Sequence, residues 1–190
     1  MSTHLLPHLS RPLPPQLAQL NHAHLDGVMA VQACAYGPTL VEAADVLGSK
    51  LRAPGGTSWG AFAVGAAPAQ APSAPGAPAT LCAYAIAHAL APGAPLVWNK
   101  LLTADRAPAP GDWLYVHDIA IHPDWAGAGL AARLLAQVLD AGRRLALTRA
   151  MLVAVQGADA YWARHGFVAQ PAPMAVQGFG DGAVWMARAL

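Results

Sequence analysis

The sequence is poor in charged residues, in targeting signals and in long apolar runs, and each shortage excludes a class of protein. Charged residues make up only 11% of the 190 positions, and the formal net charge is +1. This balance provides no basic surface for DNA, RNA or an anionic membrane. No run of about 18 apolar residues is free of charge and proline, so we expect no membrane-spanning helix. Residues 1–16 hold four prolines and lack the continuous apolar core of a secretory signal.

Cysteine is also scarce, because the chain contains only Cys34 and Cys82. Two thiols this far apart, in a chain with no recognisable targeting segment, are expected to stay reduced, which favours a cytoplasmic protein. The histidines stand at no ligand spacing from cysteines or carboxylates, so the sequence predicts no metal site.

Hydrophobic residues, by contrast, make up 55% of the chain, which is typical of a packed globular protein. Turn residues and apolar periodicity predict a flexible proline-rich arm at residues 1–16 and a single domain at residues 17–190. The expected helices are residues 24–36, 39–51, 129–144 and 157–165, and the expected strands are residues 57–65, 80–89, 113–122, 150–155 and 183–189. This order of elements indicates a mixed α/β sheet.

Two irregular segments interrupt the pattern and are expected to form mobile loops. Residues 66–79 consist mainly of Ala, Pro, Ser and Gly, a composition that cannot build a core. An insertion without function explains them at least as well as a functional loop. Residues 90–112 combine prolines with Trp98 and Asn99. We favour a place beside the substrate for this second segment, because long loops in compact domains are often functional.

The most specific segment is WLYVHDIAIHPDWAGAGLAARLL, at residues 113–135. An alternating apolar strand leads into a turn that contains Gly127 and Gly129, and the turn opens directly into an amphipathic helix. Small residues leave the backbone N–H groups of the turn accessible at the positive end of the helix dipole. The sequence therefore predicts a phosphate-binding site at this turn.

Two well-known nucleotide-binding turns do not fit this segment. The Rossmann turn requires glycine directly after the strand, whereas five residues separate Ile121 from Gly127. It also requires an acidic residue about 20 positions further on, where this chain has an apolar strand near Leu152. No Gly-Lys-Ser/Thr sequence follows the glycines, which excludes a P-loop.

A longer pattern fits better. The segment IAIHPDWAGAGLA at residues 119–131 is followed, after one helix and one strand, by YWARHGF at residues 161–167. Together they resemble the GNAT (Gcn5-related N-acetyltransferase) superfamily, in which a strand leads to a glycine turn that usually opens with Arg or Gln. A second landmark of that family is an aromatic residue four positions before a Gly-Phe pair. The resemblance implies an α+β acyl-CoA acyltransferase fold, with a mainly antiparallel central sheet flanked by helices.

By this resemblance the co-substrate is acetyl-CoA, and no metal is required. The turn at residues 126–131 would bind the pyrophosphate, and the strand backbone at Ile119 and Ile121 would pair with the pantetheine arm. The Arg or Gln that usually opens the turn is Ala126 here, so one side-chain contact is lost. The implied cofactor-binding residues are Ile119, Ala120, Ile121, Ala126, Gly127, Ala128, Gly129, Leu130, Ala131 and Trp162.

Acetyl transfer to an amine benefits from a base, because an alkyl amine with a pKa near 10.4 is almost fully protonated at pH 7. Histidine titrates near neutrality and suits this role. The candidate general base is His117, acting through water. It lies with Tyr115 where the arylalkylamine N-acetyltransferases, one branch of the superfamily, carry two histidines. A strand histidine that only bonds to a neighbour is the structural alternative.

Strand geometry decides which side chains accompany His117. Regular alternation predicts Tyr115, His117, Ile119 and Ile121 on one face of the strand, with Asp118 and Ala120 on the other. Asp118 becomes an alternative base if a bulge turns its side chain toward the acceptor, although a structural role in holding a loop is favoured for it.

The departing CoA thiolate raises a second question. Many GNAT enzymes place a tyrosine hydroxyl beside the sulfur, but the matching position here is Trp162, whose indole N–H is not a useful acid. Tyr161 reaches the sulfur only through a one-residue shift. We favour the alternative, in which Trp162 packs against the pantetheine and the thiolate, with a pKa near 8.5, leaves unassisted.

Four residues further out are weaker candidates for the acceptor pocket. Tyr36 and Glu42 lie where this fold commonly lines that pocket, and Trp98 and Asn99 lie in the second irregular segment. Surface or packing roles are favoured for all four.

The sequence thus predicts an N-acetyltransferase that passes an acetyl group from acetyl-CoA to a primary amine by direct attack. The acceptor is a small molecule, an amino acid or a peptide, with no nucleic-acid or membrane partner. A homodimer paired through the final strand is a family-level expectation only. The alternative is a GNAT-fold acyl-CoA-binding or sensor protein with little turnover, which Ala126 and Trp162 would suit.

Overall fold

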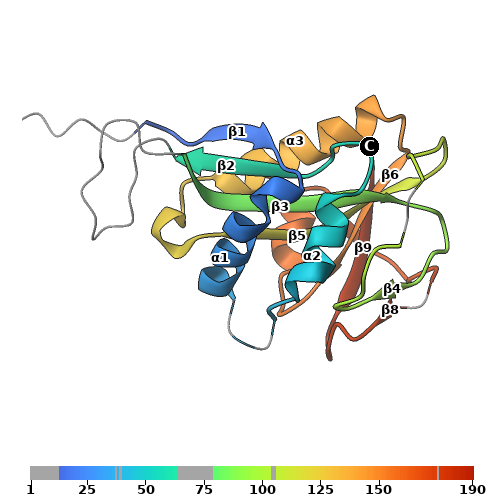
Figure 1. Cartoon of the computed structure of the whole chain (residues 1–190). Coiled ribbons are helices and arrows are strands. Elements are labelled where there is room, and N and C mark those ends of the chain that lie inside the picture. The colour runs from blue at the N-terminus through green and yellow to red at the C-terminus, as the bar shows by residue number, and fades with distance from the viewer. Residues whose placement is uncertain (1–12, 37, 39, 64–78, 104–105, 175) are drawn as a thin grey trace, which may run out of the picture.

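The computed structural model describes residues 13–36, 38, 40–63, 79–103, 106–174 and 176–190. A seven-stranded sheet forms its centre, in the order β1-β2-β3-β5-β6-β9-β7 (Figure 1). The strands are β1 (Gln16–Gln19), β2 (Trp59–Ala63), β3 (Thr80–Leu90), β5 (Trp113–Ile121), β6 (Arg149–Ala154), β7 (Val168–Ala169) and β9 (Val184–Ala189). All neighbours pair antiparallel except β5 and β6, which pair parallel. The predicted mixed, mainly antiparallel sheet is confirmed.

Helices cover both faces of this sheet. They are α1 (Leu25–Ala35), α2 (Ala44–Leu51), α3 (Leu130–Arg144) and α4 (Asp159–Arg164), with the 3-10 turns η1 (His22–His24) and η2 (Pro123–Trp125). In Figure 1, α1 and α2 lie in front of the sheet and α3 lies behind it. Two buried clusters follow this division. One joins α3 to the sheet through leucines and valines, and the other joins α1 and α2 to Tyr84 and Ile86 of β3.

Two strands diverge in the middle of the sheet. β5 pairs with β3 along its whole length, from Trp113 to Ile121. It pairs with β6 only over Trp113–Tyr115. From Val116 onward, the edge of β5 that faces β6 therefore has no strand partner in the described part of the chain. This divergence leaves backbone groups free to bind an extended molecule.

A bulge in β5 overturns the predicted arrangement of its side chains. Asp118 pairs with Ile86 and Val116 with Ala87, so His117 is an extra residue without a partner on β3. An extra residue shifts the alternation of side chains by one position. The prediction that Tyr115, His117, Ile119 and Ile121 share one face was therefore wrong.

The actual division of β5 is different. Ile119 and Ile121 pack with Leu114 and Val116 against the α3 side, whereas Ala120 belongs to the cluster of α1 and α2. Asp118 also faces α1, through Tyr36. The bulge thus brings His117 and Asp118, two adjacent residues, to the same side of the sheet.

The sequence pattern missed the short strands. β1 begins at Gln16, inside the segment predicted as a flexible arm, and residues 1–12 of that arm lie outside the described residues. The segment 90–112 contains β4 (Leu96–Val97), which pairs with β8 (Val176–Gln177) in a separate two-stranded sheet. The predicted loop at residues 66–79 lies outside the described residues except for its last position. Strands of two to four residues carry too few alternating positions to be predicted from the sequence.

Candidate active site

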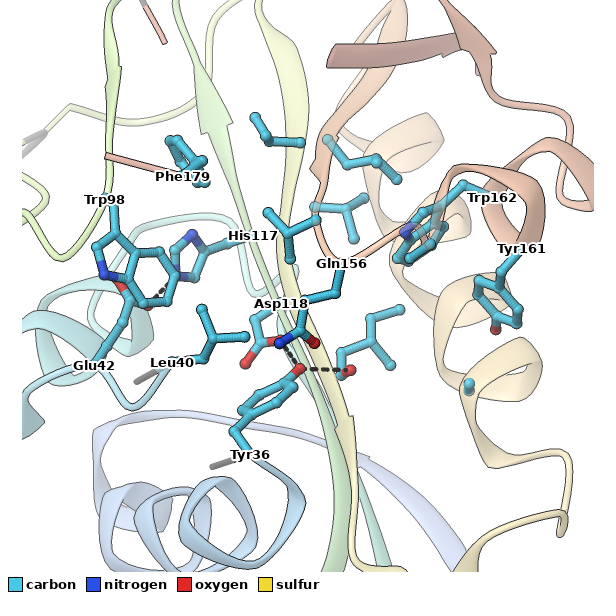
Figure 2. A pocket seen from close by; sticks show the side chains of 17 residues that line it. Tyr36, Leu40, Glu42, Trp98, His117, Asp118, Gln156, Tyr161, Trp162 and Phe179 are labelled. Carbon is cyan, nitrogen blue, oxygen red and sulfur yellow. Dashed lines mark hydrogen bonds and ion pairs between the residues drawn. The ribbon is translucent and has the colours of Figure 1, made fainter. Parts of the chain in front are cut away.

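A pocket of about 340 Å3 lies where β5 and β6 diverge. Figure 2 shows its two ends, with Asp118 between them. The Glu42 end consists of Tyr36, Leu40, Glu42, Trp98, His117 and Phe179. The Trp162 end consists of Ala131, Val155, Gln156, Ala158, Tyr161 and Trp162. The wall between them is apolar and comes from β5 and β6.

The glycine turn borders the Trp162 end of the pocket through Ala131 of α3. Gly127 and Gly129 both have positive φ angles, of 76° and 70°, which favour glycine. A Cβ atom at either position would meet no atom within 4 Å, so the space above the turn is open. Gly129 caps α3 without a side-chain hydrogen bond. The first N–H groups of a helix have no partner within it, so those of α3 point into this open space.

The turn is accessible from solvent. Residues 126–129 are exposed, whereas Leu130 is buried in the core beneath the turn. No acidic side chain lies in the first turn of α3. An anion at this position would meet backbone dipoles and no opposing carboxylate from the helix.

Glu42 is the most constrained side chain of the pocket. It is only 2% exposed, and its backbone is held in both directions by the Gln32 side chain. Gln32 Nε2 donates to the Glu42 carbonyl at 3.1 Å, and the Glu42 N–H donates to Gln32 Oε1 at 3.0 Å. The backbone N–H of Asn99 donates to Glu42 Oε1 at 3.0 Å. These contacts fix the carboxylate before α2 begins.

Glu42 forms a buried hydrogen bond with His117 and a buried ion pair with Lys50. His117 Nε2 bonds to Glu42 Oε2, and Lys50 Nζ lies 3.7 Å from Glu42 Oε1. Burial alone would raise the pKa of Glu42, but the His117 and Lys50 contacts outweigh it and hold that pKa below its ordinary value. Burial lowers the pKa of Lys50, and Glu42 partly offsets the effect. The site is thus an ionised carboxylate with two basic neighbours.

The two nitrogens of His117 have different environments. An ionised carboxylate can only accept, so Nε2 carries the proton in the bond to Glu42. Nδ1 is buried and has no hydrogen-bond partner within the residues that the structure describes. In the neutral ring this nitrogen holds a lone pair, which is the state that a base requires.

Asp118 lies next to His117 but has a different set of partners. Tyr36 donates its hydroxyl to Oδ1 and Tyr84 donates to Oδ2, both at 2.5 Å. Burial raises the pKa of Asp118, and the two hydroxyl groups offset part of that effect. The same hydroxyl lies 3.2 Å from the carbonyl oxygen of Ile119 and can share its proton with it. Both oxygens of Asp118 are therefore occupied by phenols.

Behind His117 lies a row of buried rings that pack edge to face. The ring centroids of Tyr115 and His117 lie 5.5 Å apart, and those of His88 and Tyr115 lie 5.4 Å apart. Tyr115 is 3% exposed and packs in the cluster of Met151 and Trp185, so it contacts the ring of His117 and does not line the pocket. Burial lowers the pKa of His88 to about 4, which keeps that ring neutral.

At the other end, Trp162 and Tyr161 both line the pocket (Figure 2). Trp162 packs edge-on against Phe167, and the ring of Phe167 is buried in the core. Tyr161 packs against His165, and burial raises the pKa of its hydroxyl. Gln156, which has a positive φ of 52°, lines the pocket between these rings and Asp118.

The segment predicted to lie beside a substrate does reach the pocket. Trp98 follows β4 and lines the Glu42 end, and its N–H donates to the carbonyl of Gln177 at 2.8 Å. Asn99 has a positive φ of 52°, and its side chain accepts from the N–H of Ala43 at 3.1 Å. The structure thus places Tyr36, Glu42 and Trp98 in the lining of the pocket, whereas Asn99 contacts Glu42 and Ala43 and does not line it. Their spacing in sequence gave no signal, because strand pairing and the β4 turn bring them together.

Within the described ranges, no helix is long and apolar enough to cross a membrane. In the same part of the chain, no three His, Cys, Asp or Glu side chains gather as a metal site would require.

Comparison with known proteins agrees with this fold. The model of the Acetyltransferase (GNAT) family matches residues 79–167, which span β3, β5, the glycine turn, α3, β6 and α4. No curated protein sequence matches the chain.

Similar solved structures include three N-acetyltransferases. The ribosomal-protein-S18-alanine N-acetyltransferase of Escherichia coli has 14% identity and a TM-score of 0.59, with 92% of each chain covered. The PaiA N-acetyltransferase of Thermoplasma acidophilum, in complex with coenzyme A, has 11% identity and a TM-score of 0.59, with 94% of this chain and 100% of that chain covered. The polyamine N-acetyltransferase of Drosophila melanogaster has 13% identity and a TM-score of 0.59, with 92% and 99% covered. At such identities the likeness concerns the fold.

Proposed function

Since the model of the Acetyltransferase (GNAT) family matches residues 79–167 of this chain, we propose that it transfers an acetyl group from acetyl-CoA to a primary amine by direct attack. The observation that carries the proposal is the continuity of one pocket, from the α3 residue Ala131 beside the open glycine turn to the Glu42–His117 pair. A donor bound at the turn and an acceptor at Glu42 would meet near Asp118, between the two ends.

In this proposal, acetyl-CoA binds through backbone groups. The pyrophosphate lies over Gly127–Ala131, where open space and the helix dipole favour an anion. The pantetheine arm extends along the edge of β5 that β6 leaves free, and the thioester carbonyl accepts from the backbone near Ile119. Ala120 points to the opposite side of the sheet, so only its backbone contributes. Ala126 adds no side-chain contact, and Trp162 packs against the arm.

His117 serves as the general base. Its Nε2 proton stays on the bond to Glu42, and Nδ1 accepts the amine proton through water. The free amine then attacks the acetyl carbon, its nitrogen loses a second proton to solvent water as the amide forms, the carbon–sulfur bond breaks, and CoA leaves as the thiolate. Asp118 is less suited to this role, since both of its oxygens already accept from phenols. Tyr115 orients the imidazole ring by packing.

Release of free CoA thiol, measured with acetyl-CoA and a panel of primary amines, tests the activity. Thermal stabilisation by acetyl-CoA, measured beside it, tests binding alone. Turnover with at least one amine supports the transferase. Stabilisation without turnover supports the alternative of an acyl-CoA-binding or sensor protein, and the absence of both contradicts any acyl-CoA function.

The His117→Gln variant tests the base. Removing a general base lowers the rate by about 100-fold or more at neutral pH and abolishes the pH dependence that the base imposes. A variant whose pH profile of kcat/KM is unchanged would exclude His117 from this role. Thermal stabilisation of the variant by acetyl-CoA is the control, because His117 is not expected to bind the cofactor.

A further inference from the structure

We infer that the acceptor is an amine with one positive charge and an aromatic or otherwise apolar substituent. This inference rests on the proposed function and concerns the Glu42 end of the same pocket. Two independent features carry it: a rigid aromatic wall, and the saturation of every pocket carboxylate by partners within the protein.

The aromatic wall consists of Trp98 and Phe179, which lie at the top left of Figure 2. Their ring centroids are 6.0 Å apart at 69°, an edge-to-face packing. The parallel pairing of β4 with β8 holds the two backbones together. Gly178, which has a φ of 83°, lies so close that a Cβ atom there would be 2.9 Å from the Cβ of Trp98. The wall is therefore fixed by backbone geometry.

A fixed wall of this kind suits a flat apolar group. Trp98 and Phe179 face the pocket together with Leu40 and the ring of Tyr36. A preorganised aromatic surface binds an aromatic ring without the entropic cost of ordering side chains. The apolar part of the acceptor would lie against this wall, with its amine directed toward His117 and Asp118.

The charges of the pocket argue against a second positive charge on the acceptor. Apart from two tyrosines, the titratable residues in its lining are Glu42, His117 and Asp118. Glu42 is ionised but already faces His117 and Lys50. Asp118 accepts from two hydroxyl groups. In the described lining no carboxylate is left for a second ammonium or guanidinium group, whose burial without a partner is costly.

The same lining argues against an acceptor that carries a carboxylate. Among the described lining residues there is no arginine or lysine, and Lys50 is engaged by Glu42 and by the carbonyl of Lys100 at 3.2 Å. A free amino acid would place its carboxylate beside Glu42 and the aromatic wall, without a counter-charge. Polyamines and free amino acids are thus both disfavoured relative to an apolar monoamine.

The test compares matched amines with the full-length enzyme and acetyl-CoA, using release of CoA thiol as the readout. The probes are 2-phenylethylamine, its carboxylated counterpart phenylalanine, and the dication 1,5-diaminopentane. We expect kcat/KM for 2-phenylethylamine to exceed the other two by about 10-fold or more, the scale on which an unmatched pocket discriminates. A higher value for phenylalanine or for the diamine overturns the inference and leaves the transferase function intact.

Variants of Trp98 test whether the aromatic wall causes the preference for 2-phenylethylamine. Trp98→Ala should raise KM for 2-phenylethylamine by about 10-fold. Trp98→Phe should bring KM back close to the wild-type value, because it restores an aromatic face. Leu101→Ala changes an exposed residue of the same segment that does not line the pocket, and it should leave KM unchanged. Equal loss for all amines in Trp98→Ala contradicts the assignment of the wall to the acceptor. Absence of turnover with every amine, in an enzyme that binds acetyl-CoA, contradicts the proposed function itself.

Discussion

The two ends of the pocket differ in whether backbone groups or side chains form them. The Trp162 end depends on backbone: two glycines with positive φ, the uncapped start of α3 and an edge of β5 that β6 leaves unpaired. The Glu42 end depends on three buried polar side chains, since His117 and Lys50 both contact Glu42, and on the backbone N–H of Asn99, which donates to the same carboxylate. One end can therefore tolerate changes of side chain that would disable the other.

This difference follows from the ligands that each end would hold. A pyrophosphate is large, doubly charged and the same in every catalytic cycle, so backbone N–H groups are sufficient to bind it. An amine must lose a proton during the reaction, which requires a titratable group held in one orientation. Orientation in a buried site requires further partners, and each partner adds a group whose loss is costly. The predictions below test whether the two ends respond in this way.

The largest effect is expected for Glu42→Gln. The amide can still accept from Asn99, but it no longer fixes the His117 tautomer, so kcat/KM should fall by about 100-fold. The variant also leaves Lys50 buried beside a neutral group, which should lower the free energy of unfolding by about 3 kcal/mol. Amine acetylation and thermal unfolding measure the two losses separately.

Two further variants separate the catalytic loss from the structural one. Glu42→Gln combined with Lys50→Met removes both buried charges, and it should recover stability without recovering activity. Asp112→Asn removes another buried carboxylate, which does not line the pocket and which forms an ion pair with Arg106 at 2.7 Å. This variant should therefore lower stability and leave activity unchanged. Recovery of activity in the double variant would show that Glu42 acts only through stability.

At the Trp162 end, a smaller effect is expected from Ala128→Asp. Ala128 is exposed between the two glycines, so the new carboxylate should leave folding unchanged. It places a negative charge beside the pyrophosphate and should raise the Kd for acetyl-CoA by about 10-fold, with a loss that shrinks at high salt. Thermal shifts at increasing acetyl-CoA measure this affinity. Ala128→Ser is the matched control, and equal binding by the Asp variant would contradict a phosphate site at this turn.

The same contrast explains what could be predicted from sequence. The turn at 126–131, its strand and its helix are adjacent in the chain, and their glycine pattern is a local signal, so the strand–turn–helix and the resemblance to the GNAT family could both be predicted. The second landmark at Trp162 and Gly166 is also local. Helix α3 was predicted almost to the residue, because its apolar face repeats regularly over four turns.

Glu42 and its partners illustrate the opposite case. Glu42 meets His117 from 75 positions away, and nothing around it in sequence distinguishes it from a surface glutamate. The bulge at His117 inserts one residue without a glycine or proline to announce it, and that residue reverses the predicted faces of Ile119 and Ile121. Register and long-range contacts decide this end of the pocket, and neither is encoded in a local pattern.

The smallest effect concerns His88, which lies behind His117 at the far end of the row of edge-to-face rings. The folded protein keeps this imidazole neutral down to about pH 4, whereas in the unfolded chain it takes up a proton near its ordinary pKa of 6.5. Between these values the unfolded state binds more protons, so the free energy of unfolding falls as the pH falls, by at most about 1.4 kcal/mol per pH unit. Above pH 6.5 this contribution is fully present and constant.

His88→Gln should remove that dependence, because the amide keeps a donor for the carbonyl of Ala89 but does not titrate. Urea unfolding at pH 8 measures the packing cost of the change, and the same measurement at pH 5 measures the remaining difference. We expect the difference in free energy of unfolding between wild type and variant to become smaller toward pH 5, because only the wild type loses stability when this group takes up a proton. Glu42 does not interfere between pH 5 and pH 8. Because its pKa is lowered in the folded protein, its contribution to the free energy of unfolding is lost only as the pH falls below its ordinary value of 4.5. A gap that is the same at both pH values would mean that His88 is protonated as readily in the folded protein as in the unfolded chain, and that the Glu42 end tolerates a buried charge behind His117.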